Sequence, residues 1–480
     1  MPHPTDPRAL IAIDLGAESC RVSLLRWIDS KPTLTLVHRF PNSPRETPQG
    51  LRWDLAHIKK GLHQGLTEAA ALAPEGIRSI AVDGWAVDYV RLNESSVATA
   101  DPYCYRDERT LASEAALHKI ISADRMREIT GIGILRINTL YQQSADTPDN
   151  QQRPWLNLPE YILHTLGARP VAEYTNATHT QMIDLATRTW SSEILTAASL
   201  PITTFPELVP PGTQLGRLTG PLAALPAYKD TILIAPATHD TASAIAGIPA
   251  HGDDWAYISS GTWSLVGTLL ETPSNHPEAA ADNFTNLGAA GGLTCFHKNV
   301  NGMWLIRQSI DFWCENGQTW TVQDLVAAAE KLPAPTDLLD VDDPDLLLPG
   351  HMPQRINKQL TTRSLPKIDE NDAPAIANLI FHSLAARYAQ VLIHIALHSG
   401  KTFRRLFLVG GGSQNLFLNR LTEAATGLQV HRGSQESSTL GNFAIQLASL
   451  ETPEGTPITP AQISHWAQVL EHAPHTAPKN

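Results

Sequence analysis

The 480-residue chain is poor in cysteine and contains no long apolar run. Its four cysteines are widely spaced and form no CxxC pair, so neither a disulfide framework nor a cysteine zinc site is expected. No stretch approaches the roughly 18 consecutive apolar residues of a membrane-spanning helix. Residues 1–10 lack the basic start and apolar centre of a signal peptide. We therefore expect a cytoplasmic protein with reduced thiols and no membrane attachment.

Positive charge is also scarce. The chain has 36 Lys and Arg residues against 48 Asp and Glu residues, which gives a formal net charge of -12. A nucleic acid as the main partner is disfavoured, because a phosphate backbone calls for basic patches. No block of like charge marks a binding tail, and nothing in the sequence indicates an oligomeric state. With 42% hydrophobic and 18% charged residues, the chain can bury the cores of two large domains or three smaller ones.

Strand and helix patterns alternate along the chain, which predicts the α/β class. Apolar residues at Leu55, Ile58, Leu62 and Leu66 predict a helix that Asp54 caps. A second, longer helical pattern runs from Ile376 to Ile395 and ends at Gly400. The expected strands are residues 10–15, 21–27, 31–40, 78–82, 231–235, 255–259, 265–269 and 406–409.

The opening pattern of the chain occurs twice. The stretches IAIDLGAESCRVSLL and AYISSGTWSLVGTLL both read as strand, polar turn with glycine, and strand. They begin roughly half a chain apart, which predicts two related domains whose turns meet across a cleft. We place the domains at residues 1–245 and 246–455, and expect residues 456–480 to form a proline-rich, peripheral tail.

Three glycine turns that follow strands are candidates for binding phosphate. They lie at Gly16, Gly261 and Gly410–Gly412. Phosphate needs converging backbone N–H groups, and ligands of open α/β sheets gather at the carboxyl ends of strands. The stretch Gly400-Lys401-Thr402 only resembles the end of a P-loop, because Ile395 stands where that motif needs a glycine. Gly400 is interpreted as a helix C-cap instead.

Two aspartates could carry chemistry. Asp14 ends a strand beside the first turn, where its carboxylate could hold Mg²⁺ or simply form an Asx-turn. Asp240 lies between His239 and a helical run, where it could cap the helix or act as a general base. Trp85 in DGWAVDYV could be a core residue or an apolar platform for a sugar. The residues alone leave these alternatives open.

Ten motifs follow one another over about residues 10–450. They are IDLGAESCR, DGWAVDYV, YRDERT, INTLYQ, EYTNATHTQ, ATHDTASAI, ISSGTWSLVG, KNVNGMWL, LVGGGSQNLFLNRL and STLGNFAIQL. Together these motifs resemble the FGGY family of carbohydrate kinases. The resemblance implies two ribonuclease-H-like domains of the actin-like ATPase fold, facing each other across a nucleotide cleft. Within the family, the match is with members that phosphorylate L-rhamnulose.

The resemblance also implies the reaction and the residues that carry it. ATP with Mg²⁺ would phosphorylate the C1 hydroxyl of L-rhamnulose, in L-rhamnose catabolism, with Asp240 as the base. Asp14 would position the metal ion. The sugar would be held by Ala86, His239, Asp240, Thr241 and Asn299. The nucleotide would be held by Ala17, Glu18, Ser19, Cys20, Arg21, Gly261, Thr262, Arg307, Gly410 and Gly411.

Four positions depart from the family pattern. Glu18 and Cys20 stand in a phosphate turn that is usually small and contains glycine, and an anion at Glu18 would repel phosphate unless it points away. Ala86 replaces a glycine expected to touch the sugar, and Arg307 stands where a glutamine is usual, next to Gln308. Two alternatives therefore remain: a kinase for another ketose, such as L-fuculose or a pentulose, and an actin-like ATP-binding scaffold without sugar chemistry.

Overall fold

The computed structural model describes residues 4–274 and 276–476, and its contacts divide the chain into two compact units. The first unit contains the chain up to His251, together with Leu270–Cys295 and the segment from Glu436 onward. The second contains Gly252–Leu269 and Phe296–Gln435. The first unit is thus assembled from segments that are far apart in the sequence.

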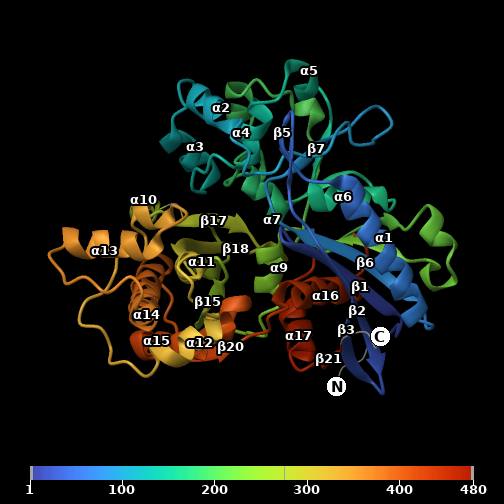
Figure 1. The fold of residues 1–480 in the computed structure, drawn as a ribbon. Coiled ribbons are helices and arrows are strands. Elements are labelled where there is room, and N and C mark those ends of the chain that lie inside the picture. Colours follow the sequence, from blue (N-terminus) through green and yellow to red (C-terminus); the bar gives the residue numbers. More distant parts are fainter. Residues whose placement is uncertain (1–3, 275, 477–480) are drawn as a thin grey trace. The chain divides into compact units, whose positions relative to one another are not determined.

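The first unit is built on a seven-stranded sheet with the strand order β13-β14-β6-β1-β2-β3-β21 (Figure 1). The pair β1·β2 and the pair β2·β3 are antiparallel, whereas β6 is parallel to both β1 and β14. The strands are β1 (Ala9–Leu15), β2 (Ser19–Ile28), β3 (Lys31–Pro41), β6 (Ile77–Gly84), β13 (Thr213–Arg217), β14 (Ile232–Ala235) and β21 (His475–Thr476).

Helices cover both faces of this sheet, because β1 is apolar on both sides. Ile11 and Ile13 belong to the core that α1 (Leu55–Leu72) completes. Leu10 and Ala12 belong to a second core, shared with α16 (Ser437–Leu450). Figure 1 shows α1 and α16 on opposite sides of the sheet. Since side chains alternate along a strand, Asp14 continues the row of Leu10 and Ala12 and lies on the α16 side. The first turn of α1 is capped by Asp54, as predicted.

Between β6 and β14 the chain makes a long excursion through short helices and two-stranded sheets. The helices are α2 (Thr110–Leu117), α3 (Ala123–Thr130), α4 (Thr139–Ser144), α5 (Pro148–Gln151), α6 (Leu158–Thr165), α7 (Tyr174–Ala177) and α8 (Ser192–Ala197). The paired strands are β7 (Tyr89–Arg91) with β8 (Trp155–Asn157), β9 (Val171–Glu173) with β12 (Glu207–Val209), and β10 (Ile183–Asp184) with β11 (Thr189–Trp190). Earlier in the chain, β4 (Arg45–Thr47) pairs with β5 (Gly50–Arg52).

The prediction of a peripheral tail is wrong for residues 460–470. They form α17 (Pro460–Leu470), which packs on α16 and buries Ile463, Trp466 and Leu470. The ring of Trp466 meets that of Trp27 edge to face, with their centroids 6.4 Å apart. The prolines of this segment do not break the helix, because Pro460 stands in its first turn, where no intrahelical N–H bond is lost.

The second unit repeats the sheet pattern of the first. Its strands run in the order β18-β16-β15-β19-β20, with β15·β16 antiparallel and with β15·β19 and β19·β20 parallel. The strands are β15 (Trp255–Ser260), β16 (Trp263–Leu270), β18 (Thr294–Asn301), β19 (Arg405–Val409) and β20 (Gln429–Arg432). Both units therefore place a hairpin before two parallel strands, which confirms the relation predicted from the repeated opening pattern.

Helices α11 (Trp304–Glu315), α12 (Val322–Ala329), α13 (Met352–Thr362), α14 (Ala373–Ser399) and α15 (Leu416–Thr426) belong to the same unit. Helix α14 is long and apolar enough to cross a membrane by length and composition, yet 56% of its most apolar stretch is buried, as in a core helix. It ends at Gly400 in the left-handed conformation, so the predicted C-cap is confirmed.

Candidate active site

Three aspartates gather at one edge of the first sheet. Asp14 and Asp83 face each other across the parallel strands β1 and β6, at the carboxyl end of both. Asp240 follows β14, the next parallel strand, and its neighbour His239 forms a bridge with Gly84. The carboxyl ends of parallel strands lie along one edge, so residues that are far apart in the sequence come together there.

Asp14 is buried and is held by two side chains. Arg21 Nη1 lies 2.8 Å from Asp14 Oδ2, and the Ser438 hydroxyl of α16 donates to the same oxygen at 3.2 Å. Burial raises the pKa of Asp14 to about 6; Arg21 acts in the opposite direction, and the nearby Asp240 adds to the rise. Asp14 is therefore more than a turn-forming residue.

Asp83 is fully buried beside Asp14. Asn442 of α16 donates to Asp83 Oδ2 at 2.6 Å, and Gln446 donates in turn to Asn442 Oδ1 at 2.7 Å. Asp83 Oδ1 has no hydrogen-bond partner among the residues described. Burial, and then the neighbouring charge of Asp14, raises the pKa of Asp83 well above its ordinary value. A buried carboxylate oxygen of this kind is suited to a cation or a bound water.

Asp240 is the first residue of α9 (Asp240–Ala246) rather than its cap. The N-cap is His239, whose side chain makes no capping hydrogen bond. The Thr241 hydroxyl donates to Asp240 Oδ1 at 3.1 Å. Burial raises the pKa of Asp240 to about 6, although 37% of its side-chain surface is open to solvent, which moderates the shift. The open surface makes Asp240 accessible to a substrate.

A second histidine contacts His239. The Nε2 atom of His179 lies 3.0 Å from Nδ1 of His239, with ring centroids 3.9 Å apart. On the other side of the His239 ring, Nε2 lies 3.4 Å from Asp240 Oδ1. Burial lowers the pKa of His239 to about 3, so its ring is neutral at pH 7.

The two unusual residues of the first glycine turn differ in burial. Glu18 is exposed, whereas Cys20 and Ser19 are buried. Burial raises the pKa of the Cys20 thiol to about 12, so this cysteine is an inert packing residue. Asn42, the residue after β3, fixes the backbone of the turn, because its Nδ2 donates to the carbonyl oxygen of Gly16 at 3.0 Å.

The segment after β6 is strained at one residue. Val87, next to Ala86, has a φ of 72°, which is unfavourable for a β-branched side chain. Its carbonyl oxygen accepts from the Thr139 hydroxyl at 2.8 Å and from Gln142 Nε2 at 3.2 Å. The INTLYQ motif therefore holds the backbone beside Ala86, which is half-buried.

Trp85 belongs to the core. Its indole N–H and that of Trp53 both donate to Asp88 Oδ2, at 2.9 and 2.6 Å, and the two rings lie 4.4 Å apart. Trp85 is 7% exposed, which leaves little ring surface for a sugar. The buried carboxylate of Asp88 thus fixes the start of the segment.

The second unit carries the other two glycine turns. Gly261 and Thr262 are exposed at the tip of the β15–β16 hairpin, and their carbonyl oxygens accept from the backbone N–H groups of Met303 and Trp304. Gly410 has a φ of 83°, and a Cβ there would lie 2.7 Å from the carbonyl oxygen of Ser260. A Cβ at Gly411 would meet nothing within 4 Å. Of these two glycines, Gly411 therefore has space beside its Cα and Gly410 does not.

Two further predicted residues also lie in the second unit. Asn299 is exposed on β18, and Arg307 is exposed on the first turns of α11. Gln308, next to Arg307, is buried and structural: its side chain accepts from Gly350 N at 2.7 Å and donates to Asp311 at 2.9 Å. Ala86, His239, Asp240 and Thr241 belong to the first unit.

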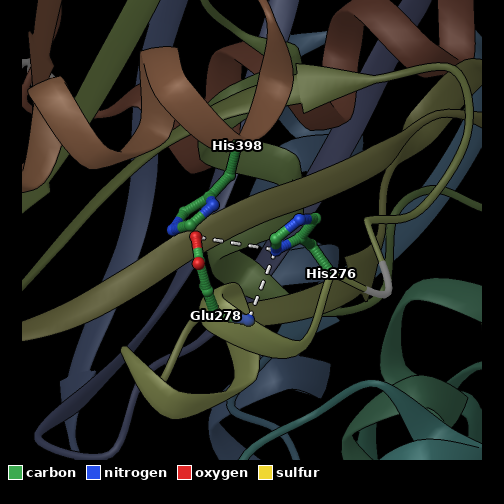
Figure 2. A group of neighbouring side chains, drawn as sticks. All are labelled: His276, Glu278 and His398. Atoms are coloured by element: carbon green, nitrogen blue, oxygen red, sulfur yellow. Dashed lines mark hydrogen bonds and ion pairs between the residues drawn. The ribbon is translucent and has the colours of Figure 1, made fainter.

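The aspartate cluster suits a divalent cation. Asp14 and Asp83 are neighbouring buried carboxyl groups at the strand edge, and Mg²⁺ prefers carboxylate oxygens and water. Figure 2 shows another place where a histidine and a carboxylate lie close together, His276 and Glu278 at the start of α10 (Pro277–Ala281). There the His276 ring accepts from the Glu278 N–H at 3.3 Å and caps the helix, which is a structural role.

Sequence reasoning gave no role to several residues of this edge. Ser438 and Asn442 belong to the STLGNFAIQL motif and reach Asp14 and Asp83 from α16. His179 belongs to the EYTNATHTQ motif. In each case the motif was the available signal, but contacts across long sequence separations cannot be read from spacing.

The family models of the N-terminal and C-terminal domains of the FGGY family of carbohydrate kinases match residues 9–247 and 256–450. A rhamnulokinase of Pectobacterium carotovorum is 37% identical over 92% of this chain and 88% of its own length. A rhamnulokinase of Enterococcus faecalis is 36% identical over 92% of this chain and 89% of its own length.

Solved structures agree on the fold. A xylulose kinase from Lactobacillus acidophilus aligns with a TM-score of 0.77 at 15% identity, over 96% of each chain. A glycerol kinase from Plasmodium falciparum aligns with a TM-score of 0.76 at 12% identity, over 98% of this chain and 94% of that one. The predicted two-domain α/β fold of the actin-like ATPases is confirmed. The chain therefore belongs to the FGGY family of carbohydrate kinases and is a phosphotransferase of that family.

Proposed function

We propose that this kinase transfers the γ-phosphoryl group of ATP to the C1 hydroxyl of L-rhamnulose, in L-rhamnose catabolism in the cytoplasm. The observation that carries the proposal is the position of Asp240, a partly open carboxylate beside two buried aspartates at the end of parallel strands. The names of the curated relatives support the choice of sugar.

Asp240 is the proposed general base. With a pKa near 6 it is largely ionised at pH 7, yet basic enough to take a proton in the transition state. The C1 hydroxyl gives its proton to Asp240 while its oxygen forms a bond to the γ-phosphorus. The bond from that phosphorus to the β,γ-bridging oxygen breaks, and its electron pair leaves with ADP. The products are L-rhamnulose 1-phosphate and ADP.

The residues proposed to bind the nucleotide lie mostly in the glycine turns. The first unit supplies Ala17, Glu18, Ser19, Cys20 and Arg21, of which the buried Ser19 and Cys20 act through their backbone. The second supplies Gly261, Thr262, Arg307, Gly410 and Gly411. The exposed hairpin tip and the open space at Gly411 support this assignment, because close approach of a nucleotide requires backbone that no side chain covers.

Asp14 is the proposed residue that positions Mg²⁺, with Asp83 beside it. The unpartnered Oδ1 of Asp83 and the raised pKa values of both carboxyl groups support it, since a cation relieves the cost of ionising them together. A bound Mg²⁺ would neutralise charge on the triphosphate.

Ala86, His239, Thr241 and Asn299 are the other residues proposed to hold the sugar. The strained backbone at Val87 supports a role for its neighbour Ala86, because strain of this kind is retained where a site needs a defined backbone. The extra methyl group of Ala86, relative to glycine, would narrow the pocket. Another ketose therefore remains the alternative substrate to be tested.

The experiment follows ADP release from Mg·ATP with L-rhamnulose, L-fuculose, L-ribulose and D-xylulose, for the wild-type protein and Asp240→Asn. We expect the largest kcat/KM with L-rhamnulose, and a loss of about 10²-fold or more in Asp240→Asn. If another ketose gives the largest value, the proposed sugar is wrong and the base stands. If Asp240→Asn stays folded and keeps wild-type turnover, Asp240 is not the base.

A further inference from the structure

Two histidines from distant parts of the sequence line up with Asp240. His179 lies in the short helix Thr178–Thr180, and its Nε2 atom meets Nδ1 of His239 at 3.0 Å. His239 Nε2 in turn lies 3.4 Å from Asp240 Oδ1. The two ring nitrogens of His239 thus connect His179 to the proposed base.

The position of the proton on the His239 ring follows from the group that each ring nitrogen faces. In its 3.0 Å hydrogen bond with His179, Nδ1 of His239 either donates or accepts, so the ring carries its N–H proton on Nδ1 or on Nε2. If that proton were on Nδ1, the lone pair of Nε2 would face the carboxylate of Asp240. If it is on Nε2, the ring donates toward Asp240, and Nδ1 accepts from His179. Only the second arrangement avoids two electron pairs facing each other, and it requires a donor at His179.

The backbone of this region is fixed well enough to maintain the alignment. The carboxyl group of Glu173 accepts from Thr238 N at 2.8 Å and from Thr175 N at 2.8 Å. The Thr175 hydroxyl accepts from His239 N at 3.4 Å. The segment that carries His179 therefore also holds the segment that carries His239, through buried groups.

We propose that His179 is a positioning residue for phosphoryl transfer: it sets the tautomer of His239, which then donates to Asp240 Oδ1. Thr241 donates to the same oxygen at 3.1 Å. These two donors hold one oxygen of the carboxylate and present the other, Oδ2, to the hydroxyl of the sugar. The inference rests on the proposed role of Asp240 and extends it to a residue that does not itself take the proton.

Three variants separate this role from simple packing. His179→Phe keeps a ring against His239 and removes the donor. His179→Gln restores an N–H donor close to the position of Nε2. His118→Phe is the matched control. The His118 ring also makes a side-chain hydrogen bond within the first unit, with the Tyr141 hydroxyl at 3.0 Å.

We expect His179→Phe to lower kcat by roughly 10-fold or more, with a KM for the ketose within about threefold of wild type, because orientation is lost and binding is kept. His179→Gln should recover most of kcat, and His118→Phe should leave kcat unchanged. In a double-mutant cycle, His179→Phe should have little further effect on a His239→Phe background. Imidazole ¹⁵N shifts of wild-type His239 should show a proton on Nε2 and none on Nδ1.

The contrary outcomes are distinct. If His179→Phe raises KM and leaves kcat unchanged, His179 contacts the sugar and does not act through His239. If the effects of His179→Phe and His239→Phe are additive, or if His239 carries its proton on Nδ1, the tautomer argument is wrong. Failure of the proposed base would appear differently, as an active Asp240→Asn variant.

Discussion

Asp14 and Arg21 are cross-strand partners at the turn end of the β1–β2 hairpin, and Arg21 Nη1 lies 2.8 Å from Asp14 Oδ2. The turn between them is thus closed by an ion pair. Because Asp14 is buried beside Asp83, its charge depends on this partner. The same arginine lies 3.8 Å from Glu436, so it is shared among acidic groups.

Replacement of Arg21 by Met should impair ATP use. Asp14 would lose its nearest positive charge, so the pKa of Asp14 should rise further. The ion pair that joins β1 and β2 beside the turn would also be lost. We expect kcat/KM for ATP to fall by roughly 10²-fold, measured with saturating ketose. Arg26→Met is the matched control, because Arg26 lies on the same strand and pairs with Glu75 away from the site. Equal losses in both variants would contradict the prediction.

The difference in stability between Asp240→Asn and the wild-type protein should depend on pH. The folded-state pKa of Asp240, about 6, lies above the ordinary value of 3.8, so the folded protein holds this proton more tightly than the unfolded chain. Its contribution to stability is present below about pH 4 and is lost as the pH rises through about 6. The amide carries no charge, so the Tm of the variant relative to wild type should be higher at pH 8 than at pH 4.5, without Mg²⁺. A difference that is the same at both pH values would refute this.

Alanine should have different effects at Gly411 and Gly412, two of the three consecutive glycines. A Cβ at Gly412 would collide with the side chain of Ser260, whereas one at Gly411 would enter open space. Gly412→Ala should therefore lower the Tm. Gly411→Ala should keep the wild-type Tm and raise the KM for ATP by roughly 10-fold, because the methyl group would stand where the nucleotide approaches. A normal KM in Gly411→Ala would place the nucleotide elsewhere.

Helix α17 should contribute substantially to stability. Trp466 is buried against α16, so Trp466→Ala should cost about 3–5 kcal/mol in the free energy of unfolding. Urea denaturation with constant m-value would measure it. His465→Ala, at the exposed neighbouring position, is the control and should change stability little. If the two variants are equally stable, the packing of α17 on α16 is not as described.

Ala86→Gly should relax the choice of sugar. Removing one methyl group from a pocket changes discrimination by about 1–3 kcal/mol, so the ratio of kcat/KM for L-rhamnulose to that for L-fuculose should change by roughly 10-fold. Competition between the two ketoses measures this ratio directly. An unchanged ratio, with unchanged stability, would show that Ala86 does not touch the substrate.

The strands and the long helices were predictable because their signals are local. The continuous apolar run from Leu10 to Ile13 indicates a strand that is buried on both faces, and the three-to-four spacing from Leu55 to Leu66 indicates a helix with one buried face. Helix α17 was missed because its prolines resemble those of a loop. Its Thr459–Gln462 capping box and the spacing of Ile463, Trp466 and Leu470 were nevertheless present in the sequence.

The site was predictable in part. Asp14 and Asp240 stand at strand ends next to turns, which local patterns can identify. The contact of Asn442 with Asp83 joins residues more than half a chain apart, and no propensity or spacing encodes it. The pairing of His179 with His239 spans 60 residues and is likewise not encoded locally. Such contacts depend on how the chain is threaded through the fold.

The threading of α16 has a consequence for biosynthesis. Asp14, Asp83 and Asp240 are synthesised early, but Ser438 and Asn442, which bind two of them, leave the ribosome much later. Domains usually fold as units during synthesis. The nascent first unit cannot complete its fold until α16 has been synthesised, and until then one face of its sheet stays uncovered. A chain that terminates before residue 436 would therefore present an exposed apolar sheet to chaperones, and Asp14 and Asp83 would lack the hydrogen bonds from Ser438 and Asn442.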